Sequence, residues 1–242
     1  MRYSNVIFSV LFSLSVNAQT TQFLLESLHL NRSISITAFD TAPEVRDKPI
    51  VYLTDGQKMI ENGSLNVIET LTRANKVPVA FYVFVSTIDE ASGVDFRNEY
   101  FFCNENYRRF FEEELIPHIE ESVFPLGRKR KSKERSLVGI SFGGLNAAYF
   151  SATATSFQSY GILSPVTYPC QQELMKHIAF SKNKDLKIFL STGTNDAERY
   201  LPPLKASYEG KGYQVKVHKT DGAHDFDNWN KQWEVVLAYL LK

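Results

Sequence analysis

The most informative part of this 242-residue chain is the stretch Gly139-Ile140-Ser141-Phe142-Gly143-Gly144 (GISFGG, 139–144). It has the form Gly-x-Ser-x-Gly and stands between a strand-like run, SLVGI (136–140), and a helix-like run, LNAAYFSAT (145–153). In that context the motif predicts a sharp strand-to-helix turn that exposes the Ser141 hydroxyl, while the glycines let neighbouring backbone pack closely. The alternative is that Ser141 only caps a helix and that the glycines form an ordinary loop.

Short apolar runs and helix-like segments alternate along most of the chain. Runs without a polar face are typical of parallel strands that helices cover on both sides. The segment 23–39 instead alternates apolar and polar residues, as an antiparallel start would. We therefore expect an α/β fold with a mostly parallel central sheet and helices on both faces. The predicted strands are 49–54, 77–86, 136–140, 160–163 and 186–191, with 214–219 alternating like a more exposed strand, and the predicted helices are 106–121, 145–153 and 228–241.

Composition indicates a globular domain and argues against two classes of partner. At 43% hydrophobic residues, the chain can bury enough apolar surface to offset its conformational entropy. The 27 Lys and Arg balance 27 Asp and Glu, which removes the positive field that nucleic-acid and acidic-membrane binders need. The one basic cluster, RKRKSKER (128–135), lacks interleaved aromatic residues, so we expect a solvated loop at the far edge of the sheet.

A serine hydroxyl needs a base to become a nucleophile, and His224 is the best-placed histidine for that task. It stands in DGAHD (221–225), a glycine-bearing loop between the last predicted strand and the last predicted helix. A carboxylate that orients the imidazole would stand between Ser141 and His224, in the chain order Ser, Asp, His. Asp196 meets this condition just beyond the strand 186–191, and Glu198 and Asp225 remain its rivals.

Two backbone N–H groups are expected to stabilise the oxyanion that such a serine forms. The residue after the nucleophile, Phe142, supplies one of them. The other should come from the loop after an early central strand, here Thr54-Asp55-Gly56-Gln57, in which the N–H of Gln57 is our candidate.

The first 18 residues resemble a secretory signal. A single Arg precedes an apolar stretch, 6–16, that is too short to span a bilayer, and Val16-Asn17-Ala18 has small residues spaced for signal peptidase. We expect residues 1–18 to be a signal peptide, residues 19–242 to form a single domain, and the mature protein to be periplasmic or secreted. Export would permit a disulfide between Cys103 and Cys170, and two free buried thiols are the alternative.

Several blocks resemble the esterase branch of the α/β-hydrolase superfamily, which includes esterase D-like, feruloyl and enterochelin esterases and the mycolyltransferases. The resemblance begins near Pro49 and runs to the C-terminus in the family's order. The blocks are VYLTDGQ (51–57), FRNEYFFCN (96–104), FFEEELIPHIE (110–120), GISFGGLNAAY (139–149), YGILSPVTY (160–168), GTND (193–196) and GAHDFDNW (222–229).

The resemblance implies an α/β-hydrolase fold and a serine carboxylic-ester hydrolase that works through an acyl-enzyme. It places Ser141, His224 and Asp196 in the catalytic positions and Gln57 in the oxyanion hole, and it implies no metal or organic cofactor. The implied substrate is a small-molecule ester, either a siderophore trilactone or an acyl or feruloyl group on a carbohydrate. Acyl transfer to another acceptor and a non-catalytic binding module with this fold are the alternatives.

Arg97 is the one further candidate for substrate binding. It lies in the segment 87–100, which we expect to overhang the serine, and its guanidinium could hold an anionic or catecholate group. The alternative is an ion pair between Arg97 and Glu99 that only fixes this segment.

Overall fold

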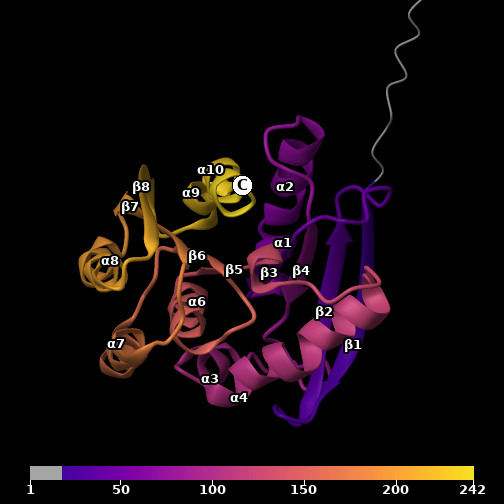
Figure 1. Cartoon of the computed structure of the whole chain (residues 1–242), viewed down its shortest axis with the longest axis horizontal. Helices are drawn as coiled ribbons and strands as arrows, with labels where there is room; N and C mark the ends of the chain where they lie inside the picture. Colours follow the sequence, from indigo (N-terminus) through magenta and orange to yellow (C-terminus); the bar gives the residue numbers. More distant parts are fainter. Residues whose placement is uncertain (1–17) are drawn as a thin grey trace, which may run out of the picture.

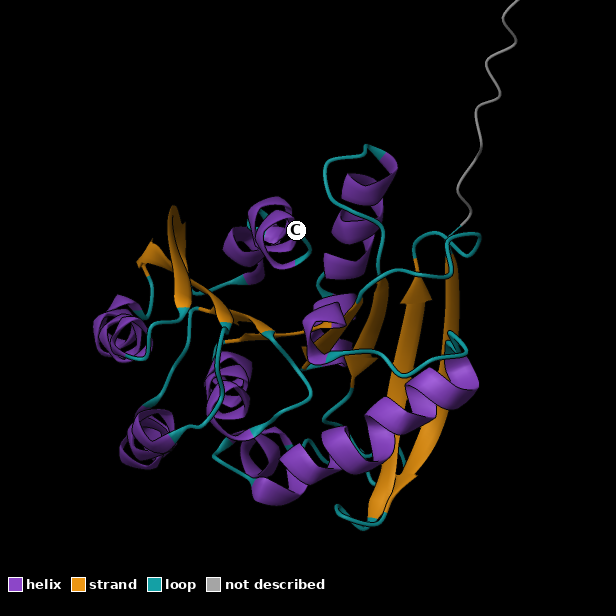
Figure 2. Ribbon diagram, viewed as in Figure 1, coloured by secondary structure: helices purple, strands orange, loops and turns teal. Residues whose placement is uncertain are grey.

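The apolar runs predicted as strands form one eight-stranded sheet in the computed structural model, which describes residues 18–242 (Figures 1 and 2). The strand order is β1-β2-β4-β3-β5-β6-β7-β8, in which β3 to β8 run parallel and β1 and β2 are antiparallel to their neighbours. This confirms the predicted mostly parallel sheet with an antiparallel start. The strands are β1 (Gln19–Ser27), β2 (Arg32–Asp40), β3 (Ile50–Thr54), β4 (Phe81–Val85), β5 (Arg135–Ile140), β6 (Ser159–Leu163), β7 (Lys187–Asn195) and β8 (Gln214–Ala223).

Helices cover both faces of the sheet, as expected (Figure 1). Side chains alternate along the central strands, so that Val51 and Leu53 pack toward one layer and Ile50 and Tyr52 toward the other. The first layer contains α1 (Gly56–Glu61), α2 (Ser64–Arg73), α9 (Phe226–Asn230) and α10 (Trp233–Leu240). The second contains α3 (Arg97–Phe101), α4 (Glu105–Arg109), α5 (Ile116–His118), α6 (Phe142–Thr153), α7 (Gln171–Phe180) and α8 (Leu201–Gly210).

The predicted helix 106–121 is a longer element of mixed type. A π-helical turn, Phe110–Leu115, follows α4 directly, and a second one, Ile119–Val123, follows α5. Phe110, Leu115 and Ile119 are all fully buried, as expected. A five-residue step from Phe110 to Leu115 does not fit an α-helical stripe, whereas the wider π turn brings both residues onto one face.

The predicted C-terminal helix 228–241 is divided into two. α9 ends at Asn230 and α10 begins at Trp233, yet Trp229 and Trp233 are both buried as expected. The structure also contains α1, α2, α7 and α8, for which the sequence yielded no residue ranges. The predicted signal peptide, apart from Ala18, lies outside the described residues. Within 18–242, no helix has both the length and the apolar character for crossing a bilayer.

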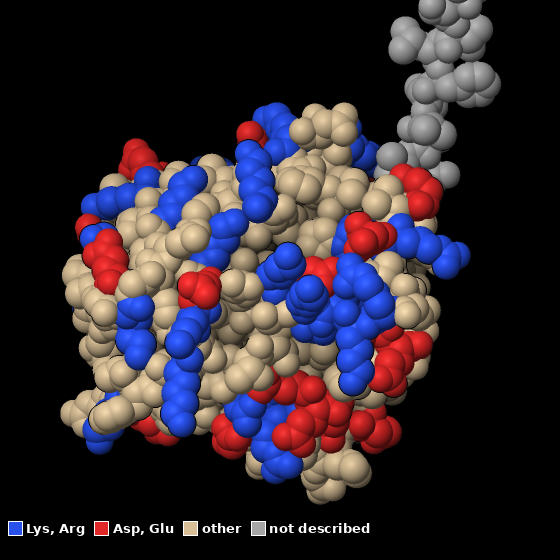
Figure 3. Space-filling view, viewed as in Figure 1, with Lys and Arg blue, Asp and Glu red and all other residues tan. Residues whose placement is uncertain are grey.

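The basic run 128–135 lies where β5 begins, at the opposite end of that strand from Ser141. Lys and Arg side chains gather there among acidic ones on the face shown in Figure 3. The expectation of a solvated loop is wrong for two of its members, because Arg130 and Arg135 are only 5% and 8% exposed. Arg135 pairs with Glu120, and Arg130 lies over the Phe124 ring at 4.6 Å.

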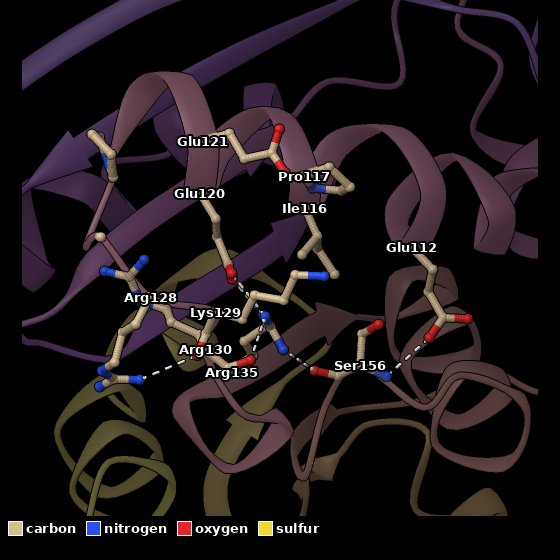
Figure 4. A pocket seen from close by; sticks show the side chains of 12 residues that line it. Glu112, Ile116, Pro117, Glu120, Glu121, Arg128, Lys129, Arg130, Arg135 and Ser156 are labelled. Carbon is tan, nitrogen blue, oxygen red and sulfur yellow. Dashed lines mark hydrogen bonds and ion pairs between the residues drawn. The ribbon is translucent and has the colours of Figure 1, made fainter.

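A cavity of about 590 Å³ opens beside this run, between it and the helix that carries Glu120 (Figure 4). Arg128, Arg130, Arg135 and Glu120 all contribute to its lining. β5 has six residues, which separates this cavity from the elbow by about 20 Å at ~3.3 Å per residue. The cavity is therefore not part of the site around Ser141.

Candidate active site

Ser141 stands at the turn between β5 and α6, as the motif predicts. Its backbone has a positive φ of 60° with ψ −117°, which is uncommon for a residue with a side chain, and α6 begins at the next residue. The Ser141 N–H donates to the carbonyl of Leu163 at 2.9 Å, and its carbonyl accepts from Val166 at 3.2 Å. These bonds tie the turn to the end of β6, so the strained conformation is held by the neighbouring strand.

The glycines around Ser141 are required by close backbone contact. A Cβ atom at Gly139 would lie 1.9 Å from the carbonyl oxygen of Gly143, and one at Gly143 would lie 2.7 Å from Oγ1 of Thr54. Any side chain at these positions would push the turn away from the end of β3. The elbow and the Asp-Gly turn after β3 are therefore packed directly against each other.

Ser141, His224 and Asp196 form a hydrogen-bonded chain. His224 Nε2 lies 2.9 Å from Ser141 Oγ, and His224 Nδ1 is hydrogen-bonded to Asp196 Oδ1. The three residues follow β5, β8 and β7, whose carboxyl ends meet at one edge of the sheet. The imidazole is 36% exposed, whereas the Asp196 side chain is fully buried. This is the arrangement in which a carboxylate orients an imidazole toward a serine hydroxyl.

Asp196 is held as a carboxylate by its hydrogen-bond donors. Burial alone would raise the pKa of Asp196, but hydrogen bonds from His224, Ser164 and the backbone N–H groups of Ala197 and Gly193 lower it below the ordinary value. An ionised Asp196 accepts hydrogen bonds only, so the proton of this pair lies on Nδ1 of His224. Nε2 then faces Ser141 with a free lone pair, as a general base requires.

The two rival acids are engaged elsewhere. Glu198 is exposed and pairs with Lys219 at 2.8 Å. Asp225 caps α9, where its side chain accepts from the Asn228 N–H at 2.9 Å. Of the three candidate acids, Asp196 is the one that the structure brings to His224.

The turn after β3 presents the other predicted oxyanion donor. Asp55 adopts a left-handed φ of 59°, and α1 begins at Gly56, so the Gln57 N–H lies in the first helical turn. N–H groups in a first turn have no partner within their own helix. The Gln57 side chain is fixed by Thr87, which receives a hydrogen bond from Nε2 at 2.7 Å and donates its N–H to Oε1 at 3.1 Å. Phe142, the other predicted donor, is the first residue of α6.

Arg97 lies beside the elbow, but its partner differs from the one considered. The alternative of an ion pair with Glu99 is wrong: Glu99 pairs with Arg32, and Arg97 donates through Nε to the buried carboxylate of Asp55. Its guanidinium also lies 5.0 Å from the centre of the Phe142 ring. Burial raises the pKa of Asp55, although Arg97 acts to lower it. Arg97 thus braces the Asp-Gly turn and the elbow together.

Three aromatic rings lie together at Phe142, the residue that follows the serine, and a disulfide joins the outer two segments. Phe142 meets Phe102 edge to face at 5.1 Å and Tyr168 at 5.9 Å. Cys103 and Cys170 form a disulfide, which joins the segments that carry the two outer rings. Of the two alternatives for these cysteines, the structure has the disulfide.

Sequence reasoning missed two residues that contact the acid and the base. Ser164, directly after β6, donates to Asp196, and Trp229 of α9 donates to Ser164 and packs edge-on against His224. Both stand inside the blocks YGILSPVTY and GAHDFDNW. Only their position in those blocks could have singled them out.

Comparison with known proteins identifies the family of the chain. A family model described as "Putative esterase" matches residues 27–240. The search of curated proteins found no match.

Solved structures share the fold at low sequence identity. A ferulic acid esterase superposes with a TM-score of 0.75 at 18% identity, over 94% of this chain and 98% of that one. The enterobactin esterase FES from Shigella flexneri, in the presence of enterobactin, superposes with a TM-score of 0.79 at 23% identity, over 92% of this chain and 59% of that one. The BES protein from Bacillus cereus superposes with a TM-score of 0.73 at 20% identity, over 99% of this chain and 100% of that one. At these identities the likeness shows a common fold, that of α/β-hydrolase esterases. With the family match spanning most of its length, the chain belongs to the Esterase family.

Proposed function

We propose that this esterase cleaves carboxylic esters through an acyl-enzyme on Ser141. His224 takes the Ser141 proton as the hydroxyl attacks the ester carbonyl, and it then passes that proton to the leaving alcohol. A water molecule, activated by the same imidazole, attacks the acyl-enzyme and releases the acid. Asp196 orients His224 and stabilises the imidazolium, and the N–H groups of Phe142 and Gln57 bind the oxyanion. The observation that carries this proposal is the continuous chain from Ser141 Oγ through His224 to Asp196.

For the substrate we propose a small-molecule ester that bears an aromatic group, with siderophore trilactones first and feruloyl esters second. The rings of Phe102 and Tyr168, which pack on Phe142 directly after Ser141 in the chain, favour a planar aromatic group. The solved structures with this fold include an enterobactin esterase and a ferulic acid esterase. Arg97, over Phe142, would contact an anionic or catecholate substituent. Residues 1–18 would direct the protein to the periplasm or beyond.

The test of the reaction is the variant Ser141→Ala, assayed with p-nitrophenyl acetate. Because the acyl-enzyme forms on this hydroxyl, we expect the turnover to fall by about 10³-fold or more. Ser151→Ala is the matched control, since Ser151 is a buried serine of α6 whose hydroxyl is paired with Tyr208 instead. Turnover by Ser141→Ala at the rate of the control would show that the nucleophile is not Ser141.

A further inference from the structure

The acid of the proposed triad accepts a hydrogen bond from Ser164, which is bonded in turn to Trp229, and both residues are buried. Ser164 follows β6, is fully buried, and donates through Oγ to Asp196 Oδ2. Trp229 of α9 is 5% exposed and donates through Nε1 to Ser164 Oγ at 2.9 Å. The same indole packs edge-on against the His224 ring, with centroids 4.9 Å apart.

The chemistry of these groups leaves one arrangement of protons. An indole N–H only donates and a carboxylate only accepts, so Ser164 must accept from Trp229 and direct its own proton at Asp196. Asp196 then receives one side-chain and one backbone donor on each oxygen: Ser164 and Gly193 on Oδ2, and His224 and Ala197 on Oδ1.

We propose that Ser164 and Trp229 are positioning residues for this esterase, which fix the carboxylate of Asp196 so that Oδ1 faces Nδ1 of His224. The backbone at Ser164 supports this role. It has a left-handed φ of 45°, uncommon for serine, and its N–H is bonded to the Ser191 carbonyl at 2.8 Å. Trp229 acts on both members of the acid–base pair: its N–H orients the Ser164 hydroxyl that donates to the acid, and its ring packs against the base.

This inference rests on the proposed function, and two pairs of variants test it separately. The relay variants are Ser164→Ala and Trp229→Phe. The matched controls are Ser151→Ala, which removes a buried hydroxyl bonded to Tyr208, and Trp233→Phe, which removes a buried indole N–H bonded to Asn230 at 3.2 Å. Each pair loses the same chemical group from a similarly buried place.

We expect Ser164→Ala to lower the kcat for p-nitrophenyl acetate by about 10-fold, with KM unchanged, because it loses a hydrogen bond to the charged Asp196. Trp229→Phe should lower kcat by about 3-fold, because it loses the weaker hydrogen bond that orients the neutral Ser164 hydroxyl. The controls should keep the wild-type kcat while losing a comparable amount of thermal stability. The low-field proton resonance of His224 Nδ1–H should shift or broaden in the relay variants and remain in the controls.

A kcat for the relay variants equal to that of their controls, with the His224 resonance unmoved, would overturn the proposal. Ser141→Ala, measured in the same series, separates the two claims. If it is inactive while the relay variants match the controls, only the positioning role fails. If Ser141→Ala is active, the proposed function itself fails.

Discussion

Ser141 combines a strained backbone with a solvent-reachable hydroxyl. A left-handed φ at a residue with a Cβ atom costs about 1–3 kcal/mol, which the surrounding contacts must offset. The bonds from Leu163 and Val166 do so from the neighbouring strand and its loop. The motif Gly-x-Ser-x-Gly made this feature predictable, because the strand, turn and helix that it requires are adjacent in sequence.

The chain order Ser, Asp, His favoured Asp196 as the acid of the triad, and its hydrogen bond with His224 distinguishes it from the rival carboxylates. We expect Asp196→Asn to lower kcat by about 10³- to 10⁴-fold, because an amide can donate to Nδ1 and turn the imidazole into the wrong tautomer. Glu198→Gln is the control, since Glu198 pairs with Lys219 at the surface, and it should retain wild-type kcat. Steady-state kinetics on both variants check this. Equal losses in the two variants would contradict the assignment of Asp196.

The roles of Ser164, Trp229 and Asp55 could not be predicted from a motif or from chain order. Their roles depend on hydrogen bonds and ion pairs between residues 65 and 42 positions apart, such as Trp229 with Ser164 and Arg97 with Asp55. No local pattern of residues specifies such a partner. For the same reason, Glu99 was a wrong candidate for the ion pair with Arg97, although it lies only two positions away.

At the scale of elements, apolar runs predicted strands better than periodicity predicted helices. Every predicted strand is present. The central strands are buried on both faces and need only an apolar run, whereas the exposed β8 was indicated by its alternation. The helix after Asn104 includes π turns, and the C-terminal helix is interrupted after Asn230, which a regular 3.6-residue period cannot represent. Helices such as α1 and α7 are short or have a weak apolar pattern, so the sequence did not predict them.

The elbow can be tested through its glycines. We expect Gly139→Ala to lower the free energy of unfolding by about 3 kcal/mol or more, because its methyl group would lie 1.9 Å from the Gly143 carbonyl oxygen. Gly210→Ala is the control: no atom lies within 4 Å of a Cβ built at this end of α8, so the variant should be as stable as wild type or up to about 1 kcal/mol more stable. Urea unfolding measures both, and similar stability of the two variants would show that the elbow is not closely packed.

At the scale of the whole molecule, the sheet brings together groups that the chain keeps apart. The turns after β3, β5, β7 and β8 lie at one edge and carry Gln57, Ser141, Asp196 and His224. The disulfide between Cys103 and Cys170 adds a covalent link across 67 residues on the same side as Phe142. The opposite end of β5 holds the basic run, in which Arg128 pairs with Glu134 and Asp47, and Arg135 pairs with Glu120. The zero net charge of the chain therefore agrees with a molecule whose candidate catalytic residues lie together at one edge of the sheet.

The nucleophile is tested most directly by reaction of the full chain with a p-nitrophenyl phosphonate, followed by mass spectrometry of the digested protein. A phosphonate captures the activated serine of a serine hydrolase by forming a stable bond to Oγ. We expect one adduct per chain, on the peptide that contains Ser141, with loss of ester hydrolysis in proportion to labelling. An adduct on another residue, or full hydrolytic activity after complete labelling of Ser141, would contradict this expectation.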